Sequence, residues 1–102
     1  MKECCREYLD GQFGGDQDVV AEIYSEYVSS MKEKAAEAEA ALAAGDWDRL
    51  DKAAHTMKGN ALMSGDTDTA AIAIGLREET KLKDRAAAEA SMAKIKEAVA
   101  GL

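Results

Sequence analysis

The chain contains a single histidine, His55, and the residues that follow it favour access to its ring. Lys58 and Gly59 come three and four residues later, so on a helix both lie on the same face as His55. Helical side chains lean toward the N-terminus, so a bulky residue at position 59 would cover the ring, whereas glycine leaves it free. Glycine costs about 1 kcal/mol relative to alanine inside a helix, so its use in this segment indicates a functional reason.

These residue types suit the handling of a phosphoryl group. A neutral imidazole, with an ordinary pKa of about 6.5, is a nucleophile near neutral pH. Lys58 offers a mobile positive charge for phosphoryl oxygens. The sequence contains no glycine-rich phosphate loop and no recognisable nucleophile–base pair, which argues against ATP binding and against a hydrolase triad. We therefore expect the phosphoryl group to arrive on another protein.

The composition predicts one all-helical domain over residues 1–102. Hydrophobic residues make up 47% of the chain, proline is absent, and no alternating β-branched runs typical of strands occur. A net charge of −7 disfavours nucleic acid and anionic membranes as partners. Because no apolar run reaches a membrane-spanning length and no signal peptide opens the chain, we expect a cytoplasmic protein. Adjacent Cys4 and Cys5 make a poor disulfide, and no set of metal ligands has zinc-site spacing.

Capping residues and apolar periodicity predict four main helices. Each begins at an aspartate, and three of the four end at a glycine: Asp16 to Gly45, Asp46 to Gly65, Asp66 to Lys81, and Asp84 to Gly101. Short connections favour antiparallel neighbours, so the expected fold is an all-α, antiparallel, up-and-down four-helix bundle. Met1 to Asp10 could add a short N-terminal helix. Phe13 is expected to pack onto the core, and Tyr24 and Tyr27 to keep their hydroxyls at its rim.

The turn at Gly65 and Asp66 sets which residues face His55. His55 lies ten residues before this turn, so residues near 75 to 77 should lie opposite it on the next helix. Gly75 would allow the two helices to approach closely. Arg77 would bring a second positive charge to the ring if its rotation around the helix is right.

The segment His55-Thr56-Met57-Lys58-Gly59, followed by Gly65, resembles the H-x-x-K-G-x-x-x-x-x-G signature of histidine-containing phosphotransfer (HPt) domains. The run from Leu42 to Asp48 resembles the family's entry into the histidine helix, and Gly14-Gly15-Asp16 resembles the start of its long helix. The resemblance extends from about Phe13 to the end of the chain. Asn60 stands where family members often carry serine, and it can also donate a hydrogen bond.

The resemblance implies a phosphocarrier in a multistep phosphorelay, not an enzyme with its own ATP site. His55 would take the phosphoryl group on its outward nitrogen, Lys58 would stabilise the group, and Gly59 would leave room for the partner. Arg77 is a plausible equivalent of the polar side chain that family members place near the ring. The partners would be receiver domains of response regulators or hybrid histidine kinases. Mg²⁺ would be bound by the receiver, with no cofactor held by this chain, which we expect to be a monomer.

Two other hypotheses remain open from the sequence. The chain could be an adaptor that docks a receiver or kinase without carrying phosphate, or it could be a plain helical scaffold or dimerisation bundle. For any docking role, the candidates for the contact surface are the residues around and beyond the histidine: Thr56, Asn60, Leu62, Met63 and Ser64.

Overall fold

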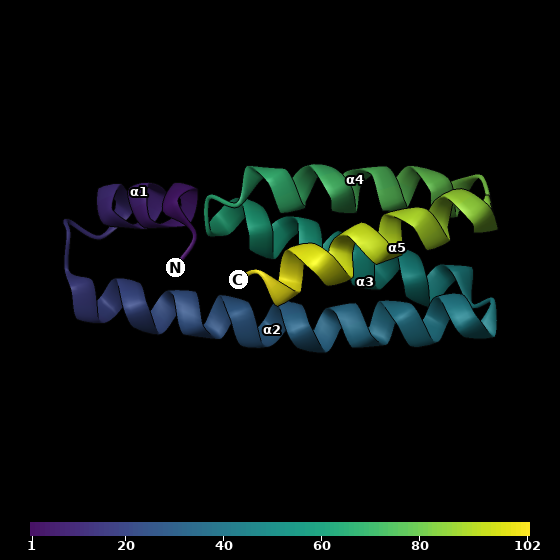
Figure 1. Cartoon of the computed structure of the whole chain (residues 1–102), viewed down its shortest axis with the longest axis horizontal. Coiled ribbons are helices and arrows are strands. Elements are labelled where there is room, and N and C mark those ends of the chain that lie inside the picture. The colour runs from purple at the N-terminus through teal and green to yellow at the C-terminus, as the bar shows by residue number, and fades with distance from the viewer.

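The computed structural model describes residues 1–102 as five helices without strands (Figure 1). The helices are α1 (Glu3–Gln12), α2 (Gln17–Ala44), α3 (Trp47–Met63), α4 (Thr67–Lys81) and α5 (Arg85–Ala100). The predicted all-α class is confirmed. The optional N-terminal helix is present, and it continues through Gly11 to Gln12.

Aspartate side chains start four of the helices, as the sequence predicts. Asp16, Asp46, Asp66 and Asp84 each accept a hydrogen bond from the backbone N–H three residues later. This bond satisfies one of the backbone donors that a helix leaves unpaired at its N-terminus. At the other end of α2, Gly45 adopts a left-handed conformation with φ 70°, so the chain turns at once into α3.

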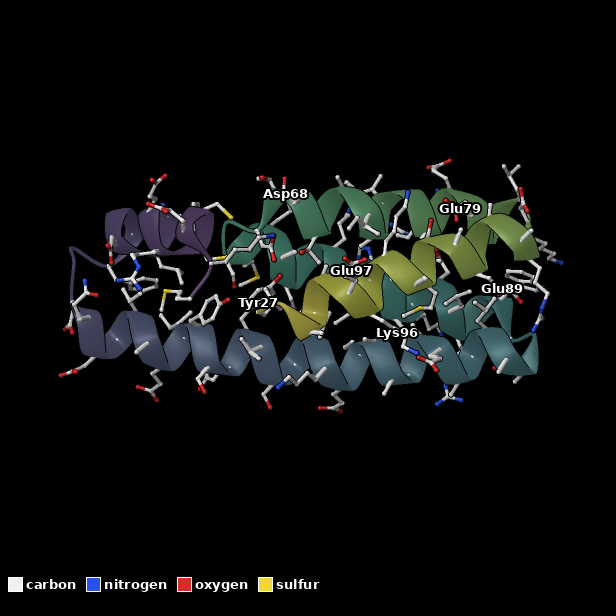
Figure 2. All side chains as sticks on the ribbon, viewed as in Figure 1. Tyr27, Asp68, Glu79, Glu89, Lys96 and Glu97 are labelled. Carbon is white, nitrogen blue, oxygen red and sulfur yellow. The ribbon has the colours of Figure 1, made fainter.

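The helices α2, α3, α4 and α5 form a closed ring of neighbours. Each contacts the next in chain order, and α5 returns onto α2. In Figure 1 consecutive helices of this ring run in opposite directions, with α2 along the whole length of the molecule. Lys96 of α5 lies above α2 (Figure 2) and forms an ion pair with Glu39, at 3.1 Å. The core between the helices is built largely from alanine, leucine and methionine side chains.

Helix α1 closes the end of the bundle where α3 turns into α4. Gly65 has φ 74° in this turn, and a Cβ built there would lie 2.6 Å from Cγ of Tyr8. Only glycine therefore fits both the turn and the contact with α1. The termini meet beside α1, because the Tyr24 hydroxyl accepts from the backbone N–H of Lys2 and donates to the carbonyl of Leu102.

A buried polar cluster fixes this end of the molecule. Asp66 is fully buried and accepts hydrogen bonds from the side chains of Lys2, Tyr27 and Thr69. The expectation for Tyr27 was therefore wrong: its hydroxyl is buried and donates to Asp66 at 2.8 Å, with Tyr27 placed between α2 and the other elements (Figure 2). Burial and the bond to Asp66 raise the pKa of the Tyr27 hydroxyl.

Two further expectations fail for geometric reasons. Phe13 is 44% exposed, because the α1–α2 loop lies beyond the end of the four-helix ring (Figure 1) and the side chain lines a surface groove, not the core. A Cβ at Gly75 would meet only Glu79 of its own helix, at 3.8 Å, so glycine is not required there for the contact between α3 and α4.

None of the five helices is long and apolar enough to cross a lipid bilayer.

Candidate functional site

His55 stands on the outer face of α3. The helix buries the opposite face, formed by Leu50, Ala53, Ala54, Met57 and Ala61, and this packing fixes its rotation. The His55 ring is exposed, and its Nδ1 atom lies 3.2 Å from Nη1 of Arg77 on α4. The other ring nitrogen, Nε2, makes no hydrogen bond within the chain. Nδ1 thus contacts the neighbouring helix, while Nε2 is open to a partner.

Arg77 reaches the ring because a carboxylate orients it. Asp51 accepts from Arg77 Nε at 3.0 Å and from Nη2 at 3.4 Å. The hydrogen bond with Arg77 lowers the pKa of the Asp51 carboxyl, and the same bond raises the pKa of the guanidinium. Arg77 thus has the rotation around its helix that brings its positive charge to the His55 ring.

Asp51 itself was missed by the sequence reasoning. A signal was available, because Asp51 lies four residues before His55 and so shares its face of the helix. Its importance depends on Arg77, which comes from a different helix, and the register between the two helices was not known from the sequence.

Lys58 and Gly59 lie one turn beyond His55 on α3. Lys58 forms no ion pair with any acidic side chain of the chain, whereas Arg49 and Lys34 elsewhere pair with Glu37. A Cβ built at Gly59 meets no atom within 4 Å. Nothing in the molecule itself therefore requires glycine at this position, and the space beside the ring is open.

The five predicted docking residues differ in exposure. Thr56 is half-buried, and its hydroxyl donates to the backbone carbonyl of Lys52. Leu62 and Met63 are exposed, at 47% and 74%, but Ser64 is buried at 5% and was wrongly placed on the surface. Ser64 is the C-terminal cap of α3, and its backbone N–H donates to the carbonyls of Asn60 and Ala61. Asn60 donates to Ser30 Oγ of α2 at 2.8 Å, so it joins the two helices.

An apolar groove lies next to the exposed end of α3. Phe13, Ile23, Asn60 and Met63 are among the residues that line it, between the α1–α2 loop and the helices α2 and α3. On α4, Ile74 is 46% exposed and precedes Arg77 by about one helical turn. Exposed apolar side chains thus flank the histidine on the side toward the α3–α4 turn.

The chemistry available at this site is that of one nucleophilic nitrogen with two cationic side chains beside it. The two cations suit an anionic group with several oxygens, such as a phosphoryl group. No three side chains of His, Cys, Asp or Glu type gather anywhere in the chain in a way that could hold a metal ion.

The chain matches a known protein family. The model of the family described as Hpt domain matches residues 22–102, which include α3, α4, α5 and most of α2. Helix α1 and the α1–α2 loop lie outside the matched range. No curated protein and no solved structure matches the chain.

Proposed function

This chain belongs to the Hpt domain family, and from that premise we propose that it carries a phosphoryl group on Nε2 of His55 between receiver domains. Members of this family are phosphocarriers in phosphorelays and not enzymes with an ATP site of their own. The finer proposal is that the donor is the aspartyl phosphate of a receiver and that the acceptor is the aspartate of a second receiver.

The observation that carries the proposal is the state of the His55 ring. It is exposed on a rigid helix, one nitrogen contacts Arg77, and the other has no partner within the chain. Because the ring is exposed on a rigid helix, it can enter the site of another protein from a fixed position, which lowers the entropic barrier to in-line attack.

Lys58 and Gly59 would serve the transfer in different ways. The ammonium of Lys58 has no competing carboxylate, so it is free to stabilise negative charge on the phosphoryl oxygens in the transition state. Gly59 leaves the approach to the ring open to the receiver. The receiver would supply Mg²⁺, and we propose no cofactor for this chain.

The receiver would dock on the surface around His55 that faces the α3–α4 turn. Leu62, Met63 and Ile74 are exposed there, and apolar side chains of this kind at the centre of an interface exclude water from the reacting groups. We propose that the chain acts as a monomer, because each transfer needs only one exposed ring.

The test is transfer of radiolabelled phosphate from a panel of phosphorylated receiver domains in the presence of Mg²⁺. We expect wild type to take up label that is lost in acid and stable in alkali, and His55→Gln to take up none. Since His55 is the only histidine, no second imidazole can substitute for it. Label that appears equally on His55→Gln would refute the carrier function.

The adaptor hypothesis makes a different prediction in the same experiment. A receiver that binds wild type and His55→Gln equally, measured by calorimetry, and transfers label to neither would support docking without phosphotransfer. The exposed Nε2 and the unpaired Lys58 favour the carrier, because an adaptor needs neither.

A further inference from the structure

Arg77 constrains which nitrogen of His55 can carry a proton. Its guanidinium is held by Asp51 through Nε and Nη2, and its third nitrogen, Nη1, lies 3.2 Å from Nδ1 of the ring. A guanidinium only donates hydrogen bonds and does not lose its proton in proteins. Whenever this bond forms, Nδ1 must therefore be the acceptor.

This requirement fixes the tautomer of the neutral ring. If Nδ1 accepts, the single ring proton sits on Nε2, the nitrogen that faces solvent. In that tautomer Nε2 has no lone pair for attack on phosphorus. To become a nucleophile, the ring must move its proton to Nδ1 and give up the bond from Arg77.

The phosphorylated ring has the opposite preference. In the transfer step, the lone pair of Nε2 forms the N–P bond, and the P–O bond to the receiver's aspartate breaks with its electron pair left on the carboxylate. The proton on Nδ1 then leaves to water, and the neutral phosphorylated ring presents a lone pair at Nδ1. Arg77 can donate to this atom without disturbing the new bond.

Discharge requires the reverse movement of the proton. The ring leaves phosphorus as a neutral imidazole only if Nδ1 first takes up a proton, whether the acceptor is a receiver's aspartate or water. A guanidinium that already occupies the lone pair of Nδ1, and carries a positive charge, opposes that protonation.

On the basis of the proposed function, we infer that Arg77, positioned by Asp51, retains the phosphoryl group on His55. It favours the phosphorylated ring over the nucleophilic tautomer, so the loaded carrier survives longer between partners. A hydrogen bond of this kind in a solvated place changes an equilibrium by about twofold to tenfold, which is the size of effect to measure. Asp51 orients the guanidinium of Arg77 and is therefore a positioning residue.

The first experiment reads the tautomer without any phosphate. In ¹⁵N-labelled protein at a pH where the ring is neutral, long-range ¹H–¹⁵N spectra report the fraction of proton on each ring nitrogen. We expect the ratio of the Nε2–H to the Nδ1–H form to be about twofold to tenfold higher in wild type than in Arg77→Met. Equal ratios in the two proteins would overturn the inference while leaving the carrier function intact.

The second experiment measures the lifetime of the loaded ring. After loading with phosphoramidate and removal of the donor, ³¹P spectra follow the loss of phosphohistidine. We expect Arg77→Met to shorten the half-life by about twofold to tenfold, and Asp51→Asn to shorten it less, because the guanidinium remains but is no longer oriented. An unchanged half-life in Arg77→Met would overturn retention.

A matched control removes an equivalent ion pair far from the ring. Arg85 donates to Glu89 on α5 with Nε at 3.1 Å, close to the 3.0 Å of the Arg77–Asp51 contact. Arg85→Met should leave both the tautomer ratio and the half-life at their wild-type values. Thermal unfolding of all variants separates loss of fold from loss of the contact. If His55 accepts phosphate from neither phosphoramidate nor any receiver, both the carrier function and retention are refuted.

Discussion

Replacement of Gly59 separates the stability of α3 from access to His55. Because a Cβ at this position meets no atom within 4 Å, Gly59→Ala introduces no clash within the chain. Alanine is favoured over glycine in a helix interior by about 1 kcal/mol. For a chain of this length, such a gain raises the melting temperature by roughly 4 °C or more.

The same position should resist larger side chains when a partner is present. Gly59 follows His55 by one turn on the same face, and a side chain there leans back toward the ring. In Gly59→Gln the added amide would keep the receiver about 1 Å or more from its productive position, and a displacement of this size costs about 100-fold in rate. Gly59→Ala, with one added carbon, should lose less.

The assay combines two measurements on each variant. Rapid mixing with a phosphorylated receiver gives the single-turnover transfer rate, and circular dichroism gives the melting curve. Gly75→Ala is the matched control, because it is another glycine to alanine change inside a helix and its Cβ would meet only Glu79 at 3.8 Å. It should gain stability in the same way and transfer at the wild-type rate.

Open space beside His55 that serves only the receiver predicts the results of both measurements. Wild-type transfer by Gly59→Gln would show that the receiver does not approach over this face of α3. A loss of stability in Gly59→Ala would show that the space beside the ring is needed by the chain itself.

Lys58→Ala should slow transfer by about tenfold to 100-fold without abolishing it, because a positioned charge assists the reaction but does not attack, and exposed Lys94→Ala should have no effect in the same assay. Gly65→Ala should lower the free energy of unfolding by about 2 kcal/mol or more, since it combines a left-handed φ of 74° with a clash against Tyr8. Gly45→Ala, with φ 70° and open space around it, should lose only the part of this free energy that comes from the left-handed backbone. Equal losses of the two variants in urea unfolding would refute the Tyr8 contribution. Burial opposes ionisation of the Asp66 carboxyl, but hydrogen bonds from Lys2, Thr69 and Tyr27 prevail and lower its pKa below the ordinary 3.8. The stabilising contribution of Asp66 should therefore be complete above pH 3.8 and disappear as the pH falls further. Urea unfolding across this range should show a shallower pH dependence in Asp66→Asn, and an unchanged slope would contradict the role of Asp66.

Much of the fold could be predicted from local sequence signals. The four aspartate caps and the glycine at the end of α2 act within a few residues of themselves, so their effect is independent of the rest of the molecule. Apolar periodicity identified the inward face of α3, which left His55 on the outward one.

Side-chain contacts between distant segments could not be predicted in the same way. The residue type of Tyr27 does not show whether its hydroxyl lies at the rim of the core or inside it. The hydroxyl donates to buried Asp66 only because α4 and the N-terminus pack against this part of α2. Phe13 is apolar, as core residues usually are. The α1–α2 loop that contains it lies beyond the end of the four-helix ring, and Phe13 is therefore exposed. These outcomes depend on where another element ends, and a sequence pattern does not contain that information.

The candidate site likewise combines contacts within one helix, which the sequence predicts, with contacts between two helices, which it does not. The sequence by itself determined that His55, Lys58 and Gly59 share one face of a helix, because the helical repeat fixes neighbours three and four residues apart. Only the tertiary structure decided that Arg77 contacts Nδ1 and that Asp51 orients it, because the register between α3 and α4 results from packing of the whole core. That packing turns a reachable imidazole into a ring whose two nitrogens have different surroundings.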